Sequence, residues 1–442
     1  MSPRDLSRRQ FIAVTSATLL ASQLPAEGVD LKSDDATKLA IEGGSKSLKN
    51  PSQKLIRWGE PERERLLSLL SQSTLLYWKA PQTTLLIQRF REHYPLKHVM
   101  TCSSGTAAVH VAIAAAGIGP GDEVITTPIT DMGTVIGILF QQAVPVFADL
   151  NPHDYNLEIA DVERKITSRT KAIIAVHLAG NPSKLNQLKQ VADQHGLILI
   201  EDCAQAWGAA YQGKPVGTIG HIACWSLQDS KQITCGEGGI VASNDERFGQ
   251  RLQPFADKGI DRNNVKQATE ILATNYRMSE LQAAFAAAQM TRMQGIAAQR
   301  AKLGNLLTRE IQGLPGITAH QVDERDRCSY YSYILRIQPK FIHCGREQFV
   351  KALNAEGIAA SAGYIPEPLY KKPLFQNHSF FAGRWPIREM GLTKMDYTKI
   401  SCPEAEAILE TCVLIRINQA MDEDYIRGIG AGIRKVTRHF TA

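Results

Sequence analysis

The sequence predicts an α/β protein whose larger part contains a mostly parallel sheet covered by helices on both faces. Short, continuous apolar runs recur along the first two thirds of the chain, and helical patterns separate them. Strands buried on both faces give such runs, and the helices that connect parallel strands lie on those faces. Residues 310–442 contain one strand pattern and two helix patterns, which predicts a second, smaller α+β domain.

Each expected element follows from a local pattern, either a short apolar run or apolar residues at helical spacing. In chain order we expect a helix at 85–94, a strand at 99–102, a helix at 106–116, strands at 123–127, 144–148 and 171–177, a helix at 185–195, a strand at 197–200, an alanine-rich helix from 278 to 293 that continues to about 307, a strand at 331–337 and helices at 346–356 and 422–439. These patterns give four parts: a signal-like segment at 1–26, a polar leader at 27–38, a large domain with an N-terminal arm at 39–307 and a small domain at 308–442.

Composition places the chain among ordinary globular proteins. Of its 442 residues, 44% are hydrophobic and 21% are charged, which suits more than one domain. The net charge of +6 is mild and no Lys/Arg block interleaves with aromatic residues, so we expect no nucleic-acid partner. The eight cysteines form no CxxC pair and accompany no His-rich pattern, so we expect no metal site and favour buried free thiols at Cys102, Cys203 and Cys224.

Lys231 carries the most specific chemical signal. It follows Ser226 in a Ser-x4-Lys spacing and precedes a glycine-rich turn at 236–239, while Asp202, 29 residues earlier, follows the apolar run at 197–200. A pyridoxal phosphate (PLP) site requires this combination. The lysine amine forms a Schiff base with the cofactor aldehyde, and the carboxylate pairs with the protonated pyridine nitrogen. A lysine alone beside such a turn is usually a solvated surface residue, so the prediction depends on the whole set.

The segment Ser104-Gly105-Thr106 lies between an expected strand and the start of an expected helix. Free backbone N–H groups and the helix dipole favour an anion there, and Gly105 lets a phosphate approach the backbone. Ser and Thr are also common N-caps, so taken alone the segment could be a plain helix start. Beside Lys231, we favour a phosphate site.

Further motifs follow one another in a fixed order along most of the chain. They are Leu39-Ala-Ile-Glu-Gly-Gly44, Ser104-Gly-Thr-Ala-Ala108, Gly121-Asp-Glu-Val-Ile125, Pro145-Val-Phe-Ala-Asp149, Glu201-Asp-Cys-Ala-Gln-Ala206, the Lys231 segment, Asn275-Tyr-Arg-Met-Ser-Glu-Leu-Gln-Ala-Ala284 and Cys402-Pro-Glu-Ala-Glu406. With these motifs the chain resembles the DegT/DnrJ/StrS family of PLP-dependent aminotransferases, best known for aminating keto sugars and cyclitols. The resemblance implies the PLP-dependent fold type I, with a large cofactor-binding domain and a smaller C-terminal domain.

The resemblance also implies roles for individual residues. Backbone amides of residues 104–106 and the Ser226 hydroxyl would hold the cofactor phosphate, and Gln205 would hydrogen-bond the ring's phenolic oxygen. Asn275 and Arg277 would reach into the neighbouring subunit's site, which implies a homodimer with shared active sites. The alternative is that Arg277 only caps a helix or pairs locally.

One departure from the family pattern concerns the face of the cofactor ring. Family members commonly stack an aromatic side chain there, within a Thr-aromatic-x-x-Thr run, whereas this chain has Thr130-Asp-Met-Gly-Thr134 with Asp131 at the aromatic position. Asp131, Met132 or another loop would have to cover the ring. Aromatic residues that could line the substrate side, or simply pack in the core, are Tyr77, Trp78 and Tyr364.

Two other ionisable residues at the ends of expected strands have alternative interpretations. Glu201 is a second carboxylate at the same strand end, but strand alternation would point it away from Asp202. His177 ends its own expected strand, where a packed structural histidine is more common than a catalytic one.

The function expected from these residues and the resemblance is amino transfer from glutamate or glutamine to a keto sugar or keto cyclitol. Lys231 would form the Schiff base and shuttle the proton between substrate and cofactor carbons. Related dehydratases have histidine at this position, so lysine favours transfer over deoxygenation. The alternatives are a PLP enzyme acting on a periplasmic substrate, by elimination or another reaction, and a non-catalytic sensor that keeps the fold.

The N-terminus suggests export. Arg8-Arg9 precede a short apolar run at 12–21, which resembles a twin-arginine signal and is too short to span a bilayer. The segment could be cleaved after Ala26 or remain attached. The alternative is a plain cationic tail on a cytoplasmic protein.

We predict that the twin-arginine route carries the folded protein out of the cytoplasm, because its receptor reads the paired arginines. Replacing both residues (Arg8→Lys with Arg9→Lys) should leave folded, cofactor-loaded protein inside the cell. Cell fractionation followed by immunoblotting measures the distribution. Wild type and variant both found entirely in the cytoplasm would contradict export.

Overall fold

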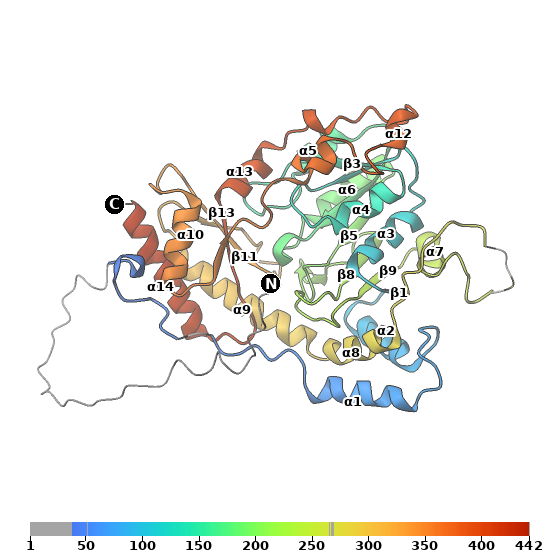
Figure 1. Ribbon diagram of the computed structural model, residues 1–442, viewed down its shortest axis with the longest axis horizontal. Coiled ribbons are helices and arrows are strands. Elements are labelled where there is room, and N and C mark those ends of the chain that lie inside the picture. The colour runs from blue at the N-terminus through green and yellow to red at the C-terminus, as the bar shows by residue number, and fades with distance from the viewer. Residues whose placement is uncertain (1–37, 51, 265, 267–268, 442) are drawn as a thin grey trace, which may run out of the picture.

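The structure is a computed structural model that describes residues 38–441 except residues 51, 265, 267 and 268. The signal-like segment at 1–26 and nearly all of the leader at 27–38 therefore lie outside the described residues. Figure 1 shows a larger and a smaller body, with α8 (Glu280–Met290) and α9 (Met293–Ile311) running from one to the other.

The larger body contains a seven-stranded sheet in the order β1-β9-β8-β5-β4-β2-β3. The strands are β1 (His98–Cys102), β2 (Glu123–Thr126), β3 (Val144–Phe147), β4 (Thr170–Val176), β5 (Ile198–Asp202), β8 (Ile222–Ser226) and β9 (Gly239–Ser243). Among β8, β5, β4, β2 and β3, each strand is parallel to the next one in the sheet. Strand β9 runs antiparallel to both its neighbours, β8 and β1. Every residue of β2, β3, β8 and β9 is buried, and since successive side chains point to opposite faces, both faces are covered.

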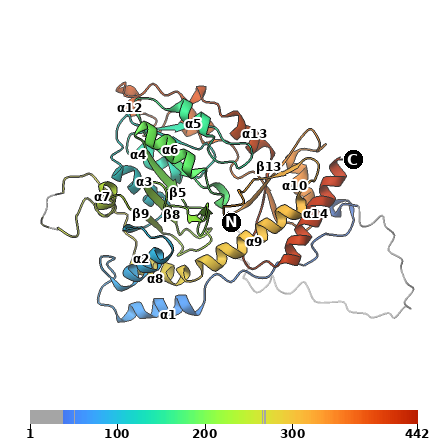
Figure 2. The same ribbon diagram turned by 180° about the vertical axis from the view of Figure 1, so that it is seen from behind.

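Helices cover this sheet. The alanine-rich helix α3 (Gly105–Ala115) packs against β8 and β9, and α6 (Leu185–His195) packs against β4 and β5; Figure 2 shows α6 on the near side of the sheet. The other helices of this body are α1 (Glu60–Ser68), α2 (Pro81–His93), α4 (Gly133–Phe140), α5 (Ile159–Lys165) and α7 (Glu246–Ala256), and a small hairpin is formed by β6 (Ala210–Tyr211) and β7 (Lys214–Pro215). The expected α/β fold with a mostly parallel sheet is confirmed.

The smaller body contains an antiparallel sheet in the order β10-β11-β13-β12. Its elements are β10 (Ile317–Ala319), β11 (Tyr333–Ile337), α10 (Arg346–Ala355), β12 (Ala360–Ala362), β13 (Cys412–Ile415) and α14 (Glu423–Thr441). The expected smaller α+β part is therefore present, with three strands besides the expected one at 331–337.

The two hydrophobic cores do not follow a single division after residue 307. Tyr370, Phe375 and Tyr397 belong to the core of the large sheet, and the Tyr397 hydroxyl donates to the Pro145 carbonyl at 2.9 Å. Residues 369–409 thus return to the larger body, through α11 (Pro373–Gln376), α12 (Pro386–Glu389) and α13 (Pro403–Thr411).

The N-terminal arm, in turn, belongs partly to the smaller body. Leu39 and Leu48 lie in its core. The buried Glu356 carboxylate accepts hydrogen bonds from the backbone N–H groups of Ala40 and Ser47, at 2.8 and 2.9 Å. The arm therefore starts on one body and reaches α1 on the other.

Two further expectations need correction. The helix expected from 278 to about 307 is two helices, because the chain breaks at Thr291–Arg292 between α8 and α9. The lysine segment lies in the connection of a hairpin, β8 to β9, that the apolar pattern did not predict. In the described part of the chain, no helix is long and apolar enough to cross a membrane.

Candidate active site

The expected site residues meet at a cavity of about 380 Å³ beyond the carboxyl ends of the parallel strands. Seven of them line it: Ser104, Gly105, Thr106, Asp202, Gln205, Ser226 and Lys231. Ligands bind at this edge in open α/β sheets, because loops from neighbouring strands converge there. Asn275 and Arg277 do not line the cavity.

Asp202 supplies a buried carboxylate at the end of β5, with 4% of its surface exposed. One oxygen accepts a hydrogen bond from the Thr134 hydroxyl at 2.8 Å, and the other accepts from the Ala204 N–H at 3.1 Å. Burial raises the pKa of Asp202, and these two bonds and the charge of Lys231 offset only part of that effect. A cationic partner at this carboxylate would complete the compensation.

The start of α3 forms an anion-binding cup. The first N–H groups of a helix have no helical partner. The Ser104 hydroxyl accepts from the Ala107 N–H, and the Ser104 carbonyl accepts from the Ala108 N–H, so the N–H groups of Gly105 and Thr106 are the ones that face a ligand. The Ser104 side chain is thus an N-cap, as the plain alternative had it, while the backbone remains free to bind an anion.

Gly105 is needed at this cup because of its neighbour on β8. A Cβ atom at Gly105 would lie 2.6 Å from the Ser226 Cβ and 2.9 Å from its Oγ, closer than side-chain carbons approach. The absence of a side chain brings the Ser226 hydroxyl next to the helix N-terminus. The cup therefore combines two backbone N–H groups with one hydroxyl, which suits a phosphate.

Lys231 lies in the connection between β8 and β9, and its Nζ sits 4.7 Å from the centre of the Tyr331 ring. The Tyr331 hydroxyl is 2.8 Å from the Ser230 hydroxyl. Tyr331 comes from the segment just before β11, so the smaller body forms one wall beside the lysine. Sequence analysis did not identify Tyr331 as a site residue, because nothing in its local pattern distinguishes it from a strand residue.

The N-terminal arm holds the lysine loop through Arg57. Its guanidinium donates to the Lys231 carbonyl at 2.7 Å and also bonds the backbone and side chain of Asp229. The Arg57 carbonyl in turn accepts from the side chains of Gln289 and Arg292, at 2.8 and 2.9 Å. The loop is therefore attached, by way of the arm, to α8 and to Arg292 in the break between α8 and α9.

Gln205 lies one turn beyond Asp202 with its amide held on both sides. The amide oxygen accepts from the Ala179 N–H at 2.8 Å, and the amide nitrogen donates to the Tyr364 hydroxyl at 3.0 Å. Tyr364 lines the cavity. The other two aromatic candidates do not, because Tyr77 is buried against Asp257 and Trp78 packs on the core.

The Thr130–Thr134 run contributes residues to the cavity wall and a hydrogen bond to Asp202. The Thr130 and Thr134 hydroxyls lie 2.8 Å apart, and Thr134 continues to Asp202. Asp131 is exposed and lines the cavity, with one oxygen accepting from the Gly133 N–H at 2.8 Å. The contact from Thr134 to Asp202 was not predicted, although the threonine itself belongs to the run.

Asn275 and Arg277 lie between α7 and α8, where they form isolated bridges with Asp257 and with Cys102 at the end of β1. Arg277 donates to the buried Asp257 carboxylate at 2.6 Å, and Arg262 and Tyr77 bond the same carboxylate. Within one chain Arg277 therefore pairs locally, and a role in a neighbouring subunit's site stays a prediction.

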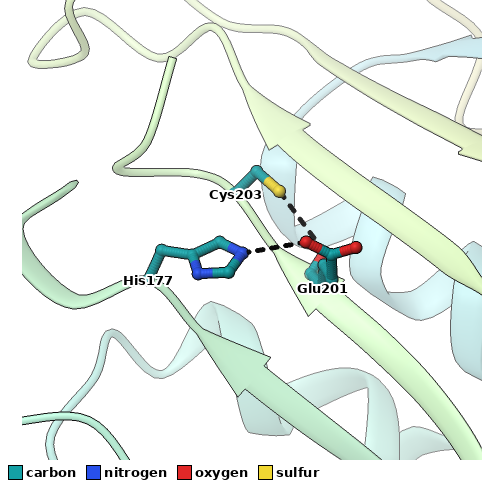
Figure 3. A group of neighbouring side chains, drawn as sticks. All are labelled: His177, Glu201 and Cys203. Carbon is teal, nitrogen blue, oxygen red and sulfur yellow. Dashed lines mark hydrogen bonds and ion pairs between the residues drawn. The ribbon is translucent and has the colours of Figure 1, made fainter. Parts of the chain in front are cut away.

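A second cluster lies behind Asp202. His177, Glu201 and Cys203 are fully buried with their ligand-type atoms within 4.8 Å of one another (Figure 3). The Glu201 carboxylate points away from Asp202 and accepts from His177 and from the backbone N–H groups at 217, 219 and 220. The second His177 nitrogen accepts from the Ser183 N–H at 3.0 Å.

These bonds determine the direction in which the pKa of Glu201 is shifted. Burial would raise the pKa of Glu201, but the bonds from His177 and from the Gly220 and Gly217 N–H groups outweigh it and lower the pKa. Both His177 nitrogens are engaged, and the cluster tightens the end of β5 next to Asp202. This geometry describes a packed structural histidine.

The cavity fits PLP on its own features. It offers a buried carboxylate for a ring nitrogen, a backbone-and-hydroxyl cup for a phosphate and a lysine amine for the aldehyde. Gly105 leaves the space that a side chain would fill. A mostly parallel sheet with these three features at its carboxyl edge is typical of a PLP-dependent enzyme.

Comparison with known proteins supports the assignment of this site to PLP. A sequence model of the DegT/DnrJ/EryC1/StrS aminotransferase family matches residues 59–434, so the chain belongs to this family. The GDP-perosamine synthase of Caulobacter vibrioides is 35% identical over 288 residues, which cover 63% of this chain and 74% of that protein.

Two other relatives extend the comparison. A protein of Streptoalloteichus tenebrarius, provisionally named L-glutamine:3-amino-2,3-dideoxy-scyllo-inosose aminotransferase, is 33% identical over 79% of this chain and 85% of its own. The X-ray structure of an aminotransferase from Psychrobacter cryohalolentis superposes with a TM-score of 0.79 at 27% identity, over 89% of this chain and all of that one.

The Arg57 contacts predict that Arg57→Ala loosens the lysine loop. Losing hydrogen bonds from a charged donor costs roughly 1.5–3 kcal/mol, so backbone amides of residues 228–237 should exchange at least tenfold faster, with weaker activity. Hydrogen exchange by mass spectrometry measures this. Arg63→Ala is the matched control, since Arg63 is an exposed arginine of α1 that pairs only with nearby Glu60. Equal exchange in both variants would contradict the role of Arg57.

Proposed function

We propose that this chain binds PLP through a Schiff base on Lys231 and transfers an amino group from glutamate or glutamine to a keto sugar or keto cyclitol. The observation that carries the proposal is the meeting of Lys231, Asp202 and the N-terminus of α3 at one cavity, in a chain of an aminotransferase family. The names of two relatives, a GDP-perosamine synthase and a glutamine-dependent scyllo-inosose aminotransferase, support sugar and cyclitol acceptors and a glutamine donor.

PLP supplies an electron-accepting ring to the reaction. Asp202 holds a proton on the ring nitrogen, because a carboxylate buried at that depth is stabilised by a cation. The Lys231 amine, steadied by the loop contacts of Arg57, moves a proton at the substrate carbon. The cup of Gly105, Thr106 and Ser226 fixes the phosphate end.

A homodimer with shared sites is part of the proposal. Arg277 lies between α7 and α8, beside Cys102 at the end of β1 and outside the cavity of its own chain. Large apolar side chains are exposed on the adjoining α1, its following turn and α8, including Leu67, Leu70 and Leu281. Exposed large apolar side chains on neighbouring helices support an interface at this place.

Lys231 should be the residue that carries the cofactor. Purified protein should show a near-ultraviolet to visible absorption band that borohydride reduces, and peptide mapping should place the reduced adduct on Lys231. Lys231→Ala should lack the band. A Lys231→Ala protein with the same band and unchanged activity would refute the assignment.

Asp202→Asn should fold and lose at least a hundredfold in kcat, about 2.7 kcal/mol of barrier, since an amide cannot hold the pyridinium proton electrostatically. Steady-state kinetics and circular dichroism separate activity from folding. Asp193→Asn, an exposed carboxylate of α6, is the control. Turnover of Asp202→Asn within a few-fold of wild type would assign the nitrogen contact elsewhere.

Shared sites predict complementation between two inactive proteins. Mixing Lys231→Ala with Arg277→Ala under subunit exchange should restore part of the activity, because one hybrid site then contains both native residues. Sedimentation should show a dimer. A fully active protein with a monomer mass would exclude shared sites.

A further inference from the structure

The charged residues that line the cavity are mostly acidic. Among the described residues that line it, the charged side chains are Asp131, Asp202, Lys231 and Glu237. The proposed function assigns Asp202 and Lys231 to the cofactor. Two exposed acids, Asp131 and Glu237, then remain on the cavity wall, and among the described lining residues no further Arg, Lys or His is present to meet an anion.

Asp131 is held rigidly in this wall. Its Oδ1 accepts from the Gly133 N–H at 2.8 Å, just where α4 begins. A Cβ at Gly133 would lie 2.7 Å from the Thr106 hydroxyl and 3.0 Å from Asp131 Oδ1, so the turn packs tightly against the phosphate cup. Within the described chain no hydrogen bond engages Oδ2. That oxygen is available to accept a bond from a ligand.

Neutral hydroxyl groups line the cavity together with this carboxylate. Tyr364, Tyr331 and Ser230 line the same cavity. Burial raises the pKa of Tyr364, and the neighbouring Tyr331, Asp131 and Asp202 raise it further, so its hydroxyl stays protonated. A carboxylate acceptor beside neutral hydroxyls matches the hydrogen-bonding groups of a polyol.

We propose that Asp131 is a specificity-determining residue that accepts hydrogen bonds from the hydroxyls of an uncharged polyhydroxylated ketone, and that the cavity disfavours acceptors bearing phosphate. The inference rests on the proposed function and narrows its acceptor to a free keto sugar or keto cyclitol. Phosphate groups are normally met by Arg or Lys. Here they would meet carboxylates instead.

Charged groups outside the cavity wall also matter for phosphate binding, namely arginines of a neighbouring copy and the amino donor itself. Arg277, which the proposed dimer would bring to a neighbouring site, already bonds the Asp257 carboxylate of its own chain at 2.6 Å, and Arg262 bonds the same carboxylate at 2.5 Å. Glutamine, one of the two proposed amino donors, is a zwitterion with no net charge. A nucleoside diphosphate, in contrast, has negative charges without a partner.

The experiment uses the full-length holoenzyme as wild type and as Asp131→Asn, whose amide oxygen keeps the bond to the Gly133 N–H. Asp424→Asn, which removes the same charge from an exposed site on α14, is the matched control. Calorimetric titrations use keto-inositol, UDP and a UDP-linked 4-keto sugar as probes, and transfer kinetics with glutamine give KM and kcat for the two ketones.

Wild type should bind keto-inositol and prefer it as acceptor. Asp131→Asn should weaken its binding and raise its KM at least tenfold, while UDP should bind at least fivefold more tightly than to wild type. Asp424→Asn should change neither. Wild type that binds no keto-inositol or prefers the UDP-linked sugar, or an Asp131→Asn protein that binds both probes within twofold of wild type, would overturn the inference. Absence of the reducible Lys231 adduct would instead overturn the proposed function.

Discussion

Asp202 places a carboxylate at the carboxyl end of β5 with 4% of its surface exposed, where an ionised group costs several kcal/mol without partners. The Thr134 hydroxyl and the Ala204 N–H provide two hydrogen bonds, and the pKa of Asp202 still lies above its usual value because burial dominates. On the other face of the strand, Glu201 is compensated by four donors. The bonds to Glu201 thus fix the orientation of the strand end. Asp202 remains the carboxylate that still requires a cation, and the surrounding loops converge on it.

The lysine loop illustrates how distant segments hold Lys231 in place at the same cavity as Asp202. Arg57 bonds the loop from the N-terminal arm, and the Tyr331 ring lies beside the Lys231 amine from the smaller body. Gln232, the residue after the lysine, donates to the Gln205 carbonyl and to the Ser329 hydroxyl, at 2.7 and 3.0 Å. Because the arm is anchored on one body and passes to the other, the geometry of the lysine depends on both bodies.

Sequence patterns predicted those parts of the fold that depend on local chemistry. The parallel strands, the helix at 185–195 and the cup at residues 104–106 follow from apolar runs and helix-start residues, and the structure contains them. The β8–β9 hairpin, the break at Thr291 and the return of residues 369–409 to the larger body depend on contacts between distant segments. Arg57 and Tyr331 escaped prediction for the same reason, since each acts across more than 90 residues of chain. The dimer role of Arg277 stays a prediction.

Family membership and the charge of the cavity constrain different ends of the site. The residues directed at the cofactor match the family, whereas Asp131 stands where family members commonly have the aromatic side chain that stacks on the cofactor ring, and we propose that its free oxygen meets the substrate. Two unit charges at 4 Å interact by about 1 kcal/mol in water and about 4 kcal/mol at an effective dielectric of 20. A carboxylate at this wall can therefore distinguish a phosphate-bearing sugar from an uncharged one, although both undergo the same chemistry at the ketone carbon. Relatives that share the fold include a GDP-perosamine synthase and a cyclitol aminotransferase, so the shared chemistry leaves the acceptor open and the charge at Asp131 discriminates between the two kinds.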